Sequence, residues 1–274
     1  MLTKVEVRTL NGDLLSLPME DISSGFVVQN IDGLDPVKAT LVTSTFAKRN
    51  GVQYHSSKLD PRNIVITLGL QPNYSVDTVK SLRDRLYDFF ISDSPVSLRF
   101  YDSGGLIVDI DGRVETCESP LFAKEPQMAI SIMCFEPSFV DVLAPVTFNG
   151  NSVATTTETP LTYLGNQTTG VTFAFMVNRS IASFSIYQRT PDGNLHTMDV
   201  NAAFVAGDVV TINTVVGSKS AILTRGGSNS SILYAIPPQA DWLTLAKGVN
   251  TMRVFVSGAA IPYKITYNNR YGGL

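Results

Sequence analysis

The sequence has few of the side chains from which metal centres and catalytic sites are usually built. It contains 2 histidines and 2 cysteines among 274 residues, and His55 and His196 lie in different halves with no second histidine at ligand spacing. A zinc site needs three or four such ligands close together. GxSxG, P-loop and dinucleotide-binding motifs are also missing. We therefore predict no catalytic, cofactor-binding or metal-binding residues and no enzymatic activity.

The cysteines and the apolar residues argue against two further classes of protein. Cys117 and Cys134 form no CxxC pair, and two cysteines are too few for the disulfide framework of a small secreted protein. Two cysteines can form one disulfide, but we expect two reduced and mostly buried thiols. No run approaches the ~20 apolar residues of a membrane helix, and the N-terminus lacks the apolar core of a signal peptide. We expect no membrane insertion, and a protein that is made and used without crossing a membrane.

Charged residues are sparse, at 16% of the chain against about a quarter in average proteins. Residues 1–144 carry 13 Lys and Arg against 19 Asp and Glu, a net charge of −6, and residues 145–274 carry 8 against 5, a net charge of +3. Neither half has the dense basic patch that binds phosphate backbones. The sequence therefore predicts no direct binding of nucleic acid. Its sparse charge suits a mainly β protein or a subunit that buries much of its surface in an assembly.

The first half has the pattern of an α+β domain, a β-sandwich or split barrel with one helix. An Asn11-Gly12-Asp13 turn separates two alternating stretches and predicts a hairpin over Lys4–Leu17. Apolar residues spaced by three and four predict a helix from Val76 to Phe90, with Ser75 as N-cap and Asp77 in the first turn. Further strands are expected at Gly25–Asn30, Ala39–Phe46, Asn63–Leu70, Val96–Tyr101, Leu106–Ile110 and Ala129–Phe135.

The second half has the pattern of a jelly-roll or galectin-like β-sandwich. Near Pro137–Pro145 charged residues thin out, and short alternating stretches separated by Gly- and Asn-rich turns follow. The closing stretches Met252–Val256 and Tyr263–Tyr267 are expected to pair as a hairpin. We therefore divide this mainly β chain into domains at residues 1–142 and 143–274. The other strands expected in the second domain are Val171–Val177, Ser183–Arg189, Leu195–Val200, Asp208–Val216, Ser220–Thr224 and Ile232–Ile236.

Four carboxylates are the only candidates for acid–base chemistry. Asp109 and Asp111 alternate on one expected strand and so share a face, as the two acids of a glycosidase do. Asp111-Gly112 also has the composition of a turn, however, and Asp109 can simply be exposed. Glu115 and Glu118 are candidates of the same kind. Solvated carboxylates are the favoured interpretation of all four.

A sugar-binding platform is the alternative function that the residues themselves suggest. Trp242, the only tryptophan, stands close in sequence to Tyr234, and exposed aromatic rings can stack on a pyranose. Trp242 also alternates like a core residue within Asp241–Leu245, and burial is the commoner fate of an aromatic side chain. The core interpretation is favoured, and a carbohydrate-binding module remains as the alternative.

Several stretches of the chain match one family pattern in order and spacing. In residues 25–139 they are GFVVQNIDGLDPVKATLV, the loop and strand KRNGVQYHSSKLDPRNIVITLGL, the helix VKSLRDRLY and the segments IDGRVE and ISIMCFEPSF; in the second half they are GDVVTIN and LAKGVN. Together they resemble the distal tail proteins of bacteriophages with long, non-contractile tails. The family often has Asp where Asn213 stands and Pro where Lys247 stands, so the second domain is expected to be a divergent sandwich.

The resemblance implies a structural role. Such proteins form a homo-hexameric ring at the tail tip of the virion, between the tail tube and the receptor-binding or fibre proteins, and the ring surrounds the channel for DNA. The resemblance also implies assembly in the host cytoplasm, with the N-terminal domain building the ring and the C-terminal sandwich projecting outward. The strand edges of the Lys4–Leu17 hairpin are one candidate for the joint between subunits. An acidic ring-forming half would repel the DNA that passes through it.

Overall fold

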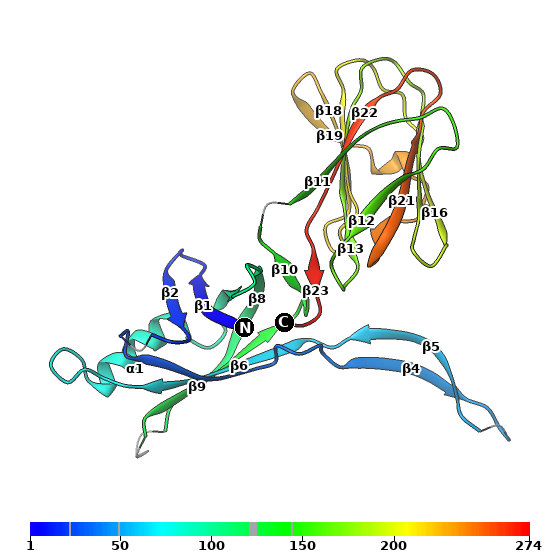
Figure 1. The fold of residues 1–274 in the computed structure, drawn as a ribbon. Helices are drawn as coiled ribbons and strands as arrows, with labels where there is room; N and C mark the ends of the chain where they lie inside the picture. The colour runs from blue at the N-terminus through cyan, green and yellow to red at the C-terminus, as the bar shows by residue number, and fades with distance from the viewer. Residues whose placement is uncertain (22, 49, 121–124, 144) are drawn as a thin grey trace. The chain divides into compact units, whose positions relative to one another are not determined.

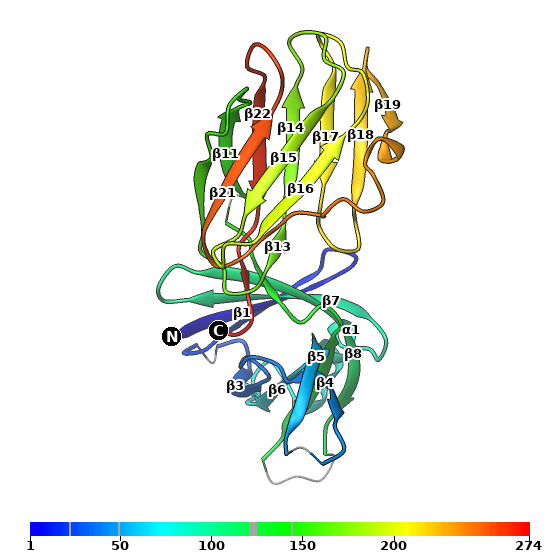
Figure 2. The ribbon, with the colours of Figure 1, turned by 90° about the vertical axis from the view of Figure 1, so that its right-hand side faces the viewer.

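The chain forms two compact units, each with its own hydrophobic core (Figures 1 and 2). The computed structural model describes residues 1–21, 23–48, 50–120, 125–143 and 145–274. The first unit comprises Met1–Leu143 together with Tyr271–Leu274, and the second comprises Ala144–Arg270. The last four residues therefore belong to the first unit, whereas the division predicted between residues 142 and 143 assigns them to the second.

A curved antiparallel sheet forms the body of the first unit. Its strands alternate, so that Val5 and Val7 point into the core while Lys4 and Arg8 point away from it. The strands at the two ends of the sheet contact each other, which closes it into a split barrel. The order is β2 (Leu14–Pro18), β1 (Leu2–Thr9), β7 (Pro95–Asp102), β8 (Ile107–Glu118), β9 (Gln127–Cys134), β6 (Arg62–Leu70) and β3 (Phe26–Asp32), and β10 (Phe139–Asp141) pairs with β8 and with β23 (Arg270–Tyr271).

One helix, α1 (Val79–Phe89), packs on the barrel against β1 and β6. Its buried side chains are Leu82 and Leu86, one turn apart on the same face. Thr78 is the N-cap: its hydroxyl accepts the Ser81 backbone N–H at 3.1 Å, and the Ser81 hydroxyl accepts the Thr78 N–H at 2.9 Å. This reciprocal capping box fixes the first turn of the helix.

The helix begins later than the apolar spacing predicts, and the proposed cap at Ser75 is wrong. The reason is a turn at Asn73, whose carbonyl accepts the Asp77 N–H at 2.7 Å and whose side-chain oxygen accepts the Ser75 N–H at 3.1 Å. Asp77 therefore precedes the first helical turn and does not lie within it.

Two further strands leave the barrel between β3 and β6. They are β4 (Ala39–Thr45) and β5 (Val52–Leu59), and they pair only with each other. Figure 1 shows them extending away from the rest of the first unit, and we call this hairpin the arm. The sequence predicts β4 but treats the residues of β5 as a loop. β5 gives no signal of burial because every one of its eight residues is exposed.

The second unit is a β-sandwich, as its sequence predicts, with the two main sheets facing each other across the core (Figure 2). One sheet has the order β11 (Val146–Asn151), β22 (Pro262–Tyr267), β14 (Thr172–Met176), β17 (Val209–Asn213), β18 (Ser220–Arg225) and β19 (Ser228–Ser231). The other has the order β12 (Thr159–Tyr163), β21 (Gly248–Phe255), β15 (Phe184–Arg189) and β16 (Leu195–Val200), and β13 (Thr169–Gly170) pairs with β20 (Thr244–Leu245).

Two sequence predictions for the second unit are wrong. The closing strands do not pair as a hairpin: β21 lies between β12 and β15, whereas β22 lies between β11 and β14 in the facing sheet. Alternation identifies a strand but not its partner, so two successive strands can cross from sheet to sheet. The strand expected at Ile232–Ile236 is instead a short 3₁₀ helix, Leu233–Ala235.

Candidate functional site

The arm has two chemically different faces. Residues opposite each other in an antiparallel pair point to the same side of the sheet. On one side lie Leu41, Val52, Tyr54 and Leu59, which we call the apolar face of the arm. The cross-strand pairs on this side are Ala39–Leu59, Leu41–Ser57, Thr43–Tyr54 and Thr45–Val52.

The opposite face is polar apart from Val42. His55, the extra residue at a bulge in β5, lies with its Nε2 2.7 Å from the Ser44 hydroxyl oxygen. The Thr40 hydroxyl donates to the Asp60 carboxylate at 2.7 Å. These cross-strand hydrogen bonds suit a face that remains in contact with water.

The apolar face is open to solvent along the whole arm. Leu41, Val52 and Tyr54 are 60, 60 and 58% exposed, and Leu59 is 42% exposed. An isolated two-stranded hairpin is only marginally stable in water, and within the described residues neither side of this one joins a core cluster. Contiguous exposed apolar side chains mark interaction sites. We therefore identify the apolar face as the candidate functional site.

The sequence contains one signal that would have revealed the arm. Asn50-Gly51 is a dipeptide typical of hairpin turns; Gly51, whose φ of 91° favours glycine, directly precedes β5 at the end of the longer loop that joins Thr45 to Val52. The alternation of Val52 and Tyr54 after this turn mirrors that of Leu41 and Thr43 before it. These residues indicate a hairpin with apolar side chains on one face. They do not indicate that the described part of its own unit leaves this face uncovered.

The four candidate carboxylates do not form a catalytic pair. Asp109 and Asp111 lie on the same face of β8, but Asp109 is held in a bidentate ion pair by Arg99, with both N–O distances at 2.7 Å. Asp111, Glu115 and Glu118 are exposed, in keeping with solvated carboxylates, whereas Asp109 is half-buried in its ion pair, unlike the exposed position that the sequence suggests.

Gly112 continues β8 and does not form a turn with Asp111. A Cβ atom at this position would lie 2.6 Å from the Ile132 side chain and 2.9 Å from the Cys134 sulfur. Glycine is therefore required by close packing against β9. A glycine needed for space and a glycine needed for a turn look alike in sequence.

The two cysteines are free thiols, as predicted. Cys134 is buried and Cys117 is half-buried. Burial raises the pKa of Cys117 to about 11 and that of Cys134 to about 12. Both side chains therefore stay protonated at neutral pH, which makes them poor nucleophiles.

The two histidines make local contacts in different units. His55 belongs to the arm, and His196 Nδ1 lies 3.3 Å from an oxygen of Asp241. Across the ranges that the structure describes, no group of three or more His, Cys, Asp and Glu side chains could hold a metal ion. Helices in those ranges are also too short or too polar to cross a membrane.

Trp242 lies between the core of the second unit and an open groove on its surface. It is half-buried and packs against the core of the second unit. It also lines an open groove of about 440 Å³ together with Leu233, Tyr234 and Pro237, and Tyr234 is 81% exposed. The Lys219 ammonium lies 5.2 Å from the centre of the Trp242 ring. This groove is the second candidate site.

Comparisons with known proteins match both units. A family model described as a phage tail protein RIFT-related domain matches residues 20–108, and one described as a siphovirus-type tail component, C-terminal domain, matches residues 164–271. Among solved structures, the SPP1 Dit (gp 19.1) protein, described as a paradigm of the hub adsorption apparatus in phages that infect Gram-positive hosts, has a TM-score of 0.70 at 16% identity, over 97% of this chain and 98% of that one.

A second solved structure is more distant. A chain of the phage P2 baseplate, in its activated conformation with Ca, has a TM-score of 0.50 at 10% identity, with all of both chains covered. At these identities the structural matches show a shared fold. No curated protein matches the sequence.

Proposed function

The chain belongs to the distal tail proteins of siphophages, because family models of siphophage tail components match both units in order. We propose that six copies of it form a hub ring at the tail tip. The chain is a structural component of a phage tail; the ring, its symmetry and its DNA channel are the proposal. The observation that carries it is the exposed apolar face of the arm.

A closed ring needs a surface on each copy that binds a different surface on the next copy. The arm has the properties of such a surface, because it extends from its own barrel and its apolar face is uncovered there. Fully burying an exposed large apolar side chain contributes about 1.5–3 kcal/mol; these four are 42–60% exposed, so covering each contributes roughly half of that, and together they favour association. We therefore assign the joint between subunits to the arm in preference to the Lys4–Leu17 hairpin.

The same proposal covers location and partners. The ring would lie in the virion between the tail tube and the receptor-binding or fibre proteins, after assembly in the host cytoplasm, with the second unit holding the adhesion proteins. The net charge of −6 on residues 1–144 supports a channel wall that repels DNA. The proposal assigns no catalytic activity to the chain.

Imaging the purified full-length protein by negative stain tests the ring directly. We expect six-fold particles with a central hole, and light scattering on the same sample should give the mass of six chains. A protein that remains strictly monomeric at high concentration would contradict the proposal.

Carbohydrate binding is a second candidate function, favoured by the groove beside Tyr234 and Trp242. The Tyr234→Ala variant should abolish binding on a glycan array without loss of stability, because this ring is 81% exposed. Tyr74→Ala, at a tyrosine that is 80% exposed in the first unit, is the matched control. If the unmodified protein binds no glycan on the array, carbohydrate binding is contradicted, whereas the ring proposal is unaffected.

A further inference from the structure

Arg62, the first residue of β6, is a buried charge at the point where the arm rejoins the barrel. It is 1% exposed. Its Nε donates to the Pro137 carbonyl at 2.8 Å, and its Nη1 donates to the Asp35 carbonyl at 2.7 Å and also to that of Gly33. Its Nη2 donates to the Gly272 carbonyl at 2.5 Å. One side chain thus joins three separate segments of the first unit.

Backbone carbonyls, not a carboxylate, hold this guanidinium. No carboxylate among the described residues forms an ion pair with Arg62, and the guanidinium carbon lies 4.4 Å from the centre of the Phe139 ring. Burial lowers the pKa of Arg62. A buried donor that loses its acceptor is costly because nothing replaces the lost hydrogen bond. The arrangement is therefore sensitive to the position of each carbonyl, including that of Gly272.

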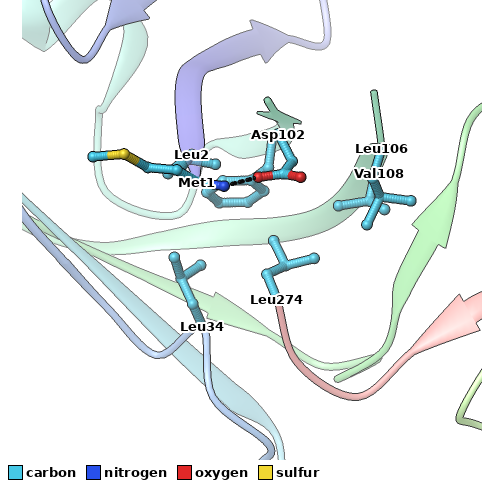
Figure 3. A pocket seen from close by; sticks show the side chains of 8 residues that line it. Met1, Leu2, Leu34, Asp102, Leu106, Val108 and Leu274 are labelled. Atoms are coloured by element: carbon cyan, nitrogen blue, oxygen red, sulfur yellow. Dashed lines mark hydrogen bonds and ion pairs between the residues drawn. The ribbon is translucent and has the colours of Figure 1, made fainter. Parts of the chain in front are cut away.

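Residues 271–274 lie along the segment that leads into the arm. The Leu274 N–H donates to the Leu34 carbonyl at 3.1 Å. A Cβ atom on Gly273 would lie 2.8 Å from Pro36 Cδ and 3.0 Å from Pro36 N, so only glycine permits this approach. Figure 3 shows the Leu34 and Leu274 side chains lining the same apolar pocket, of about 420 Å³. We call residues 271–274 the strap.

The root of the arm lies directly beyond this segment. The Asp60 N–H donates to the Lys38 carbonyl at 3.0 Å and closes the base of the hairpin. Residues 33–38 enter the arm and residues 60–62 leave it. Arg62 bonds both the entering segment and the strap, so these three pieces of chain are fixed together at one place.

We propose that Arg62 and the strap form a clasp that fixes the root of the arm and thereby sets the direction in which the arm is presented to a neighbouring copy. Arg62 is in this sense a positioning residue, since it lies in the core and not on the apolar face. The inference rests on the proposed function for the arm, but the clasp itself can be tested in a single chain.

Hydrogen exchange on the full-length protein tests the clasp. Gly273→Val forces the strap away from Pro36. Arg62→Met removes all the hydrogen bonds from this side chain to backbone carbonyls. The matched control is Arg113→Met, at an arginine that is half exposed in the same barrel. We expect the Asp60 amide to exchange at least tenfold faster in both clasp variants, with amides of β7 and β8 unchanged. The control should retain the protection of the unmodified protein.

Assembly supplies the second measurement. The clasp variants should weaken subunit association at least tenfold by light scattering. Leu41→Ser should weaken it with the Asp60 amide still protected. An unchanged exchange rate at the Asp60 amide would overturn the clasp. So would an equal rise in the exchange rates of the β7 and β8 amides, because general destabilisation predicts that rise. If Arg62→Met does not fold, the result for Gly273→Val decides. A monomeric unmodified protein would overturn the ring, while exchange at Asp60 would still decide the clasp.

Discussion

The β1–β2 hairpin and the arm belong to the same unit and are both antiparallel pairs, but they place their apolar residues in opposite environments. In β1–β2, Val5, Val7, Leu15 and Leu17 are at most 8% exposed, because β1 pairs with β7 and the inner face joins the barrel core. In the arm, the corresponding apolar side chains are 42–60% exposed. The same local pattern therefore stabilises the subunit in one place and remains available to a partner in the other.

Deleting the arm gives the largest expected difference between the two hairpins. Replacing residues 40–58 by a short Gly-Ser turn should abolish assembly completely, because the proposed joint is gone. The barrel should keep its fold, since no described residue of the arm joins either core. Light scattering measures the first effect and circular dichroism the second. Rings that still form without the arm would contradict the assignment of the subunit joint to the arm.

Truncating one leucine in each hairpin sharpens the contrast in stability. Leu17→Ala should lower the free energy of unfolding by about 2–5 kcal/mol, because it leaves a cavity in the core. Leu41→Ala should change that free energy by less than about 0.5 kcal/mol, since the residue is exposed. Urea denaturation at concentrations where the protein is monomeric checks both. Equal losses would mean that the arm is part of the monomer's core.

The outward side of β1 carries a network of charged side chains, whereas no ion pair is found among the described residues of the arm. Burial raises the pKa of Glu6, but hydrogen bonds from Lys4, Tyr101 and Arg8 outweigh it and lower the pKa to about 2 from 4.5. The folded-state pKa is below the unfolded value. The stabilisation is therefore complete above about pH 5.5 and is lost as the pH falls from about 4.5 to about 2.

Glu6→Gln should accordingly cost about 1.5–3 kcal/mol at neutral pH, the range for hydrogen bonds to a charged group. It should also flatten the fall in stability between about pH 4.5 and pH 2. Denaturation series across this range measure both. A variant with the same acid sensitivity as the unmodified protein would show that Glu6 is not a major source of it.

The tip of the β1–β2 hairpin provides the smallest expected effect. Leu10 is 84% exposed, but it is a single apolar residue in a turn. Leu10→Ser should leave both stability and assembly unchanged within about 0.5 kcal/mol. Loss of assembly in this variant would transfer the subunit joint to the Lys4–Leu17 hairpin, as the sequence first suggested.

The sequence predicts most strands because a buried face imposes alternation. β1, β6 and β9 show it clearly, and their inward residues are buried. β5 was missed for the opposite reason, since none of its residues is buried and no core imposes a pattern. The candidate site is therefore the part of the first unit that sequence patterning describes least well, because a surface kept for a partner resembles a polar loop.

Long-range arrangement was also beyond the sequence pattern. The pairing of β21 and β22 with different strands depends on the packing of two sheets, which no local spacing encodes. Arg62 belongs to one of the stretches that match the family pattern. Its hydrogen bonds, however, join positions up to 210 residues apart, since they reach the carbonyls of Gly33, Asp35, Pro137 and Gly272. Only the folded chain brings those carbonyls to one point.

Two adjacent residues on opposite faces of the arm permit the most direct test of its role. Leu41 and Val42 are 60 and 50% exposed, so serine at either position removes a similar apolar surface. Light scattering over a concentration series should show at least tenfold weaker association for Leu41→Ser and unchanged association for Val42→Ser. Equal behaviour of the two variants, whether both assemble or both fail, would contradict the assignment of the joint to the apolar face.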